Sequence, residues 1–127
     1  MAAEIVVIVN SSNNLTELTR RQVVDLYMGR TSHFPNGEQS KRYDQPINST
    51  VRADFYYRMT QRPIAAINAY WARLIFTGRA SPPTTVTDNE DMLRIVENDP
   101  NAIGYLDKQY INDKVTVVLE LEHDLND

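Results

Sequence analysis

The sequence predicts an α/β domain, a three-layer sandwich in which a mixed, mostly parallel sheet carries helices on both faces. Short β-branched segments alternate along the chain with segments of helical period, and no internal repeat or low-complexity stretch interrupts them. The first apolar segment, residues 4–9, is continuously apolar after its first residue, which is typical of a strand that is covered on both faces. We therefore expect this strand to lie in the centre of the sheet.

Length and composition indicate one globular domain. The chain has 127 residues, enough for a single core, so we expect one domain over residues 1–127. It has 13 basic and 17 acidic residues, a net charge of -4, and no basic stripe, which argues against nucleic acid as a partner. The absence of cysteine excludes disulfides and thiolate nucleophiles. The longest apolar run, residues 5–9, is too short to span a bilayer.

Capping signals predict the first two helices. Thr19 forms a capping box with Gln22, and Gly29 stands where a glycine ends a helix. The second helix is expected over residues 50–59, with Ser49 as its N-cap.

Two more helices follow. Pro63 suits the first position of a third helix and Gly78 its end, while Thr87 and Glu90 form a second capping box for a fourth helix that ends at residues 99–100. The core face of the third helix is expected to contain Ile64, Ile67, Trp71, Leu74 and Ile75. Helical spacing also places most of a set of aromatic residues in the core, with the tyrosine hydroxyls reaching the surface: Tyr56, Tyr57, Tyr70, Trp71 and Phe76.

One further strand is expected to carry Arg42 and Asp44 and to end at Pro46, and others are expected at residues 84–86, 102–106 and 114–121. Residues 122–127 are acidic and predict a frayed tail.

The segment 41–52 has the pattern of an anion site. It predicts the end of a strand, a short polar loop and a helix start, which together present backbone N–H groups and the positive end of a helix dipole. Asn48, Ser49 and Thr50 add small hydrogen-bonding side chains at the same place. The sequence therefore predicts an oxyanion site at this loop.

Three charged residues flank the loop. Arg42 and Asp44 lie two apart on a strand, so both project from one face, and we expect Asp44 to pair with Arg42 and orient it toward the loop. Arg52 falls in the first helical turn, where a cation costs about 0.3 to 1 kcal/mol unless an anion lies beside it. The alternative interpretation is an ordinary Ser49 cap with a surface ion pair beside it. The predicted ligand-binding residues are Arg42, Asp44, Asn48, Ser49, Thr50 and Arg52.

The sequence does not predict catalysis. The two histidines, His33 and His123, lie in a loop and in the tail, and no nucleophile elbow, P-loop or dinucleotide motif is present. Glu120, Glu122, His123 and Asp124 resemble a metal cluster, but strand alternation separates them, so a solvated acidic end is the better interpretation. We predict no catalytic residue, no metal site and no cofactor.

Three motifs, in this order, carry a resemblance to a known family. They are Leu-Tyr-Met-Gly-Arg at 26–30, Arg-Tyr-Asp at 42–44 with Ser-Thr at 49–50, and Asn-Ala-Ile-Gly-Tyr at 101–105. Together they resemble the PstS-type phosphate-binding proteins of ABC transporters, over about residues 5–121. The resemblance implies one lobe of a type 2 periplasmic binding protein, an exported bacterial location with the signal peptide removed, and binding of inorganic phosphate or a similar oxyanion for phosphate uptake or sensing.

The chain departs from that family in two ways. Its loop lacks both glycines of the phosphate loop and has Gln-Pro-Ile-Asn at 45–48, and the chain corresponds to one of the family's two lobes. A homodimer or a partner protein is therefore expected to cover the half-site. The competing interpretation is a protein-interaction module that kept the fold and lost the anion. An enzyme ranks last.

Overall fold

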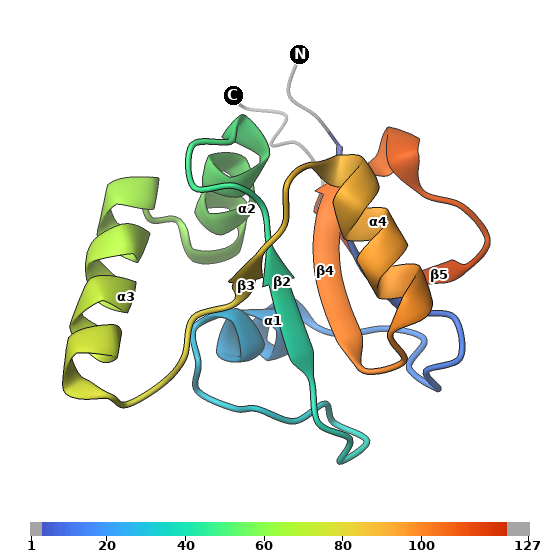
Figure 1. Cartoon of the computed structure of the whole chain (residues 1–127), viewed down its shortest axis with the longest axis horizontal. Coiled ribbons are helices and arrows are strands. Elements are labelled where there is room, and N and C mark those ends of the chain that lie inside the picture. The colour runs from blue at the N-terminus through green and yellow to red at the C-terminus, as the bar shows by residue number, and fades with distance from the viewer. Residues whose placement is uncertain (1–3, 122–127) are drawn as a thin grey trace.

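The computed structural model describes residues 4–121, which form a five-stranded sheet with helices on both faces (Figure 1). The strands are β1 (Ile5–Asn10), β2 (Lys41–Asp44), β3 (Thr84–Thr85), β4 (Ala102–Asp107) and β5 (Val115–Leu121). The helices are α1 (Arg20–Tyr27), α2 (Thr50–Thr60), α3 (Ile64–Thr77) and α4 (Asn89–Asn98), with a short 3-10 helix, η1 (Lys108–Tyr110). The predicted α/β class is confirmed.

The sheet is mixed because β1 runs against its neighbours. The strand order is β3-β2-β4-β1-β5, in which β2 is parallel to both β3 and β4. β1 pairs antiparallel with β4 on one side and with β5 on the other, so the other four strands share one direction. Every residue of β1 is buried, as its sequence predicts. β1 is an interior strand, although the middle position belongs to β4.

Alternate residues of β1 face two separate hydrophobic clusters. Ile5, Val7 and Val9 pack in the larger cluster with buried residues of α1, α2 and α3. Val6 and Ile8 pack in the smaller one with Met92 and Val96 of α4. Alternate side chains of a strand point to opposite faces of the sheet, so β1 packs against helices on both faces.

Most helix ends agree with the capping signals. Thr19 and Gln22 form both hydrogen bonds of the predicted box at α1, and Gly29 follows that helix with φ of 75°. At α2, Ser49 Oγ accepts a hydrogen bond from the amide of Arg52 at 3.0 Å. Pro63 is the N-cap of α3, one position earlier than predicted.

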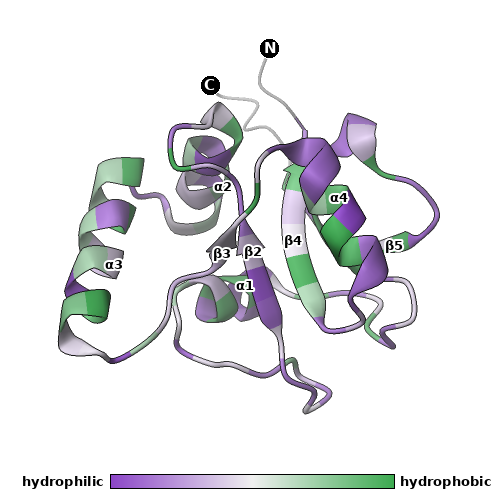
Figure 2. Cartoon of the chain, viewed as in Figure 1, coloured by the Kyte–Doolittle hydropathy of each residue, from purple (hydrophilic) through white to green (hydrophobic). Residues whose placement is uncertain are grey.

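Two predictions about the later helices are wrong. Asp88, not Thr87, caps α4, and its carboxylate accepts from the amide of Asp91, because a carboxylate one residue on is an equally good cap acceptor. Ile75 and Phe76 of α3 are 53% and 91% exposed, since α3 buries only a narrow stripe against the rest of the protein. Figure 2 shows that apolar residues also occur elsewhere around this helix.

Candidate functional site

The end of β2 places the carboxylate of Asp44 in the interior, where Asp44 is 4% exposed. One of its oxygens accepts from the amide of Gln45 at 2.9 Å and from the hydroxyl of Tyr105. The other accepts from the hydroxyl of Tyr56 at 2.9 Å and from Nε of Arg52 at 3.3 Å. Four donors, from the residue after β2, from α2 and from β4, therefore satisfy this buried charge.

The two tyrosines keep their protons. Burial raises the pKa of Tyr56 and of Tyr105 well above the ordinary value, and the negative charge of Asp44 raises both further. Both hydroxyls are therefore donors to Asp44 at any physiological pH. The ring of Tyr105 stacks on Phe55 with 3.6 Å between centroids, which fixes the hydroxyl against the carboxylate.

Arg52 is held by side chains of the protein itself. Besides its ion pair with Asp44, it donates from Nη1 to Oδ1 of Asn68 at 2.8 Å, and its guanidinium lies 5.2 Å from the centroid of the Tyr56 ring. Asp44 is thus the anion that an arginine in the first turn of α2 requires. Within residues 4–121, Nη2 of Arg52 donates to no acceptor.

Arg42 does not pair with Asp44, so the predicted Arg42–Asp44 interaction is wrong. Its guanidinium donates instead to the carbonyl of Leu26 at 3.2 Å and to that of Ser81 at 2.7 Å, and it lies 5.8 Å from the centroid of the Trp71 ring. Burial lowers the pKa of Arg42. Arg42 therefore connects the end of α1 to the segment before β3.

The start of α2 is open. Asn48 and Thr50 are exposed and Ser49 is partly exposed, with its amide bonded to the carbonyl of Pro46 at 2.9 Å. The hydroxyl of Ser49 already accepts from Arg52, as expected of a cap. The amides of Thr50 and Val51 donate to no acceptor among the described residues. Two backbone donors at the positive end of the helix dipole are thus free.

An open groove of about 280 Å³ lies beside this helix start. Asp44, Arg52 and Asn68 form its polar wall. The rest of its lining is mostly apolar and includes Ile47, Trp71, Ile75, Pro82 and Pro83. Trp71 is 5% exposed, and its Nε1 has no acceptor in the part of the chain that is described.

The structure brings five of the six predicted residues to one place: Asp44, Asn48, Ser49, Thr50 and Arg52. Arg42 lies on β2 nearby, but its guanidinium is used elsewhere. Sequence reasoning missed Tyr56, Tyr105 and Asn68 as members of the network. Tyr56 lies four residues after Arg52 on one helix, and this spacing was the signal that could have placed it in the network. We expected its hydroxyl at the surface.

No metal or membrane feature is found in residues 4–121. This part of the chain has no group of three or more His, Asp or Glu side chains that would hold a metal ion, and His33 lies exposed in a loop. No helix in the same residues is long and apolar enough to cross a membrane. Glu122, His123, Asp124 and the predicted tail at 122–127 lie outside the described residues.

Solved structures share the fold of this chain, and two of them are described as proteins of phosphate transport. A structure described as a candidate phosphate ABC transporter substrate-binding protein with bound phosphate, from Clostridium perfringens, matches with a TM-score of 0.73 at 18% identity. An ABC-type phosphate transport receptor from Vibrio cholerae matches with 0.72 at 18% identity, and PstS from Borrelia burgdorferi with 0.69 at 10%. This chain has the fold of the PstS-type proteins.

The match is to part of those proteins. It covers 91% of this chain and 44%, 45% and 46% of the three structures, respectively, so the chain spans less than half of their length. This agrees with the predicted resemblance to a single lobe. No family model matches the sequence, and no curated protein sequence matches it either.

Proposed function

We propose that this chain is a non-catalytic, solute-binding-like domain that binds phosphate or a similar oxyanion at the start of α2. The observation that carries the proposal is the pair of free amides at Thr50 and Val51, at the positive end of an 11-residue helix. The fold shared with phosphate-binding proteins supports it. The proposal includes an exported bacterial location and a link to ABC-type phosphate uptake or sensing.

Each residue of the site has a distinct role in this proposal. The two amides and the side chains of Asn48, Ser49 and Thr50 provide hydrogen bonds to the anion. Arg52 supplies positive charge through Nη2, its one terminal nitrogen without an acceptor among the described residues. Asp44 does not contact the anion but holds the guanidinium in place.

Arg42 has a positioning role in the proposal. By bonding to the carbonyls of Leu26 and Ser81, it fixes the start of the segment whose Pro82 and Pro83 line the groove. Its guanidinium therefore acts through the shape of the groove.

A single lobe sets the expected affinity. Water reaches the anion from the open side, so each charge-assisted hydrogen bond contributes near the lower end of about 1.5 to 3 kcal/mol. Three such contacts give about 4 to 5 kcal/mol, which corresponds to a dissociation constant near the millimolar range. Screening of the exposed charges by salt weakens binding further.

Isothermal titration calorimetry with inorganic phosphate tests the proposal. We expect weak binding by the monomer that decreases as sodium chloride is raised, with sulfate competing. Micromolar binding by a proven monomer would contradict the half-site argument. Absence of heat at tens of millimolar phosphate, well above the range estimated from three contacts, would contradict oxyanion binding itself.

A second candidate is a protein-interaction module that kept the fold without the anion. The apolar wall of the groove favours it, because Ile47 and Ile75 are 62% and 53% exposed. Large exposed apolar side chains beside a groove are typical of surfaces that bind another protein. The calorimetric result separates the two candidates, since this one requires no phosphate binding.

A further inference from the structure

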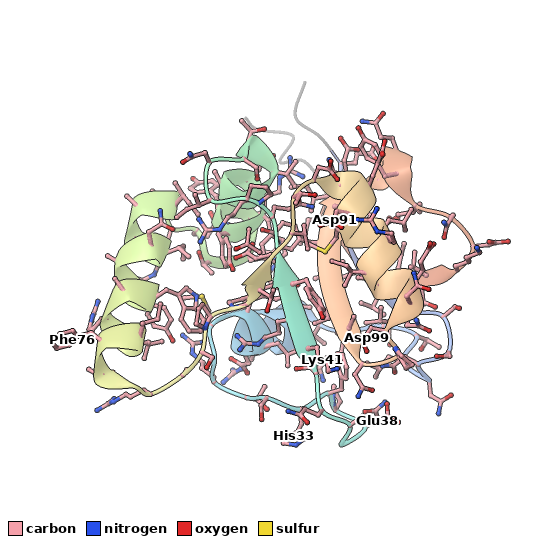
Figure 3. All side chains as sticks on the ribbon, in the orientation of Figure 1. His33, Glu38, Lys41, Phe76, Asp91 and Asp99 are labelled. Carbon is pink, nitrogen blue, oxygen red and sulfur yellow. The ribbon has the colours of Figure 1, made fainter. Side chains whose placement is uncertain are left out.

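Helix α3 has an exposed apolar face that the rest of the described protein does not cover. Four residues form this face, all exposed, and we call them the α3 stripe: Ala65, Ala69, Ala72 and Phe76. Their spacings of four, three and four residues place them within about 60° of arc on the helix. Phe76 is 91% exposed, and Figure 3 shows it at the outer side of α3, away from the sheet.

We infer that the α3 stripe is where a second copy of this chain packs, helix against helix in antiparallel orientation. The stripe is self-complementary in that orientation. With a two-fold axis passing between positions 70 and 71, Phe76 lies opposite Ala65 of the second copy, and Ala72 lies opposite Ala69. Each copy thus places its one large residue over the other's small residue, as an isologous interface requires.

The parallel orientation does not offer this fit. It sets Phe76 against Phe76 and alanine against alanine, which separates the helices at one end and leaves the alanines without contact. Packing density inside an interface core matches that of protein interiors, so the antiparallel arrangement is the one that fills the space.

The low charge of α3 also fits the core of a protein interface. Arg73 is the only charged residue among the 14 residues of this helix, in a chain in which 24% of residues are charged. Arg73 lies about 70° from the centre of the α3 stripe, so it stays at the edge of the contact and out of its centre. Depletion of charge is typical of the core of an interface between proteins.

The area of the stripe predicts a weak dimer. A 14-residue helix is about 21 Å long and, with side chains, about 10 Å wide. That footprint is on the order of 200 Å², well below the roughly 800 Å² per partner of a standard stable interface. Ile75 of α3 and Ile47 of the loop before α2 are also exposed, but they line the groove beside the stripe. We therefore expect a dimer that depends on protein concentration.

Sedimentation equilibrium over a wide range of protein concentration tests this inference, which does not depend on the proposed binding of phosphate. We expect wild type to pass from one to two chain masses. Phe76→Glu buries a charge in the interface and is expected to remain a monomer throughout. The matched control is Tyr57→Glu, at a half-exposed aromatic residue of α2, which is expected to dimerise like wild type. A wild type that stays monomeric at the highest concentration, or a Phe76→Glu variant that dimerises unchanged, would overturn the inference.

Disulfide trapping tests the orientation, because the chain has no cysteine of its own. An equal mixture of Ala65→Cys and Phe76→Cys chains is expected to form the mixed disulfide under mild oxidation. Each variant alone is not expected to do so, since its two copies of one position lie about 16 Å apart along the helices, beyond the roughly 7 Å limit between Cα atoms. Equal cross-linking in the single-variant samples, or none in the mixture, would rule out this register.

Discussion

The carboxylate of Asp44 and the start of α2 are only six residues apart in sequence, yet they differ in what they leave free. Asp44 is buried and accepts four hydrogen bonds from the protein. The start of α2 is exposed, and the amides of Thr50 and Val51 have no acceptor among the described residues. The charged residues thus form a scaffold, while the donors left free for the proposed anion belong mainly to the backbone.

Removal of the carboxylate should produce the largest loss of stability. Asp44→Ala leaves Arg52 buried without its ion pair, and breaking a buried pair in this way costs about 3 to 5 kcal/mol. Asn48→Ala, in the exposed loop, is expected to change the free energy of unfolding by less than about 0.5 kcal/mol. Urea denaturation measures both. A loss below about 1 kcal/mol for Asp44→Ala, a fraction of the cost of breaking a buried pair, would show that the carboxylate is not the centre of the scaffold.

Loss of one donor to the carboxylate should have a smaller effect. Tyr105→Phe removes a hydrogen bond to a charged acceptor and is expected to lower the free energy of unfolding by about 1.5 to 3 kcal/mol. Tyr57→Phe serves as the control, because the hydroxyl of Tyr57 makes no hydrogen bond within residues 4–121 and the residue is half exposed. Equal stability of the two variants would contradict the assignment of Tyr105 to the network.

The network also predicts a dependence of stability on high pH. Burial raises the pKa values of Tyr27, Tyr56 and Tyr105 in the folded state, so above about pH 10 the unfolded chain loses these protons first. The contribution of these tyrosines to the free energy of unfolding is therefore fully present below about pH 10. Above that pH the free energy of unfolding falls by up to about 1.4 kcal/mol per pH unit for each tyrosine. In denaturation curves from pH 9 to 11, Tyr105→Phe should show a slope shallower by one such tyrosine. A slope equal to that of wild type would contradict the claim that Tyr105 stays protonated in the folded protein.

The smallest effect on stability is expected at the start of α2. Ser49→Ala removes the side-chain acceptor for the amide of Arg52 and should lower the free energy of unfolding by about 1 kcal/mol. Ser49→Gly should cost only a few tenths of a kcal/mol, because glycine is tolerated at an N-cap. If both variants were as unstable as Asp44→Ala, the distinction between the buried Asp44 network and the exposed start of α2 would be wrong.

The sequence predicts the elements well because their signals are local. The Thr19 capping box, the Ser49 cap and the glycine after α1 depend on residues within a few positions, and all three are observed. The burial of β1 follows from its own apolar run. Once these helices and strands pack together, they determine the interior position of β1, the strand pairing and the fold class.

The site was harder to predict because its contacts join distant segments. The choice of Arg52 rather than Arg42 as the partner of Asp44 depends on how α2 approaches β2, which no spacing within β2 reveals. Tyr105 reaches Asp44 from another strand, 61 residues away. The exposure of Phe76 could not be predicted either. A helical period shows which face of a helix is apolar, but not how much of that face the neighbouring elements bury.

The central claim is that backbone amides at the start of α2 bind phosphate, and Thr50→Pro tests it most directly. Proline at the first helical position removes one free N–H and preserves the helix, and the preceding Ser49, with φ of -76° and ψ of 143°, already has the conformation that proline requires. Thr50→Ala is the control, since it removes the hydroxyl and keeps the amide. In calorimetric titrations, both variants lose the hydroxyl contact, but Thr50→Pro also loses the amide and should bind phosphate at least about tenfold more weakly than Thr50→Ala, as expected for one further lost bond to an anion. Equal phosphate affinity of Thr50→Pro and Thr50→Ala would contradict the claim.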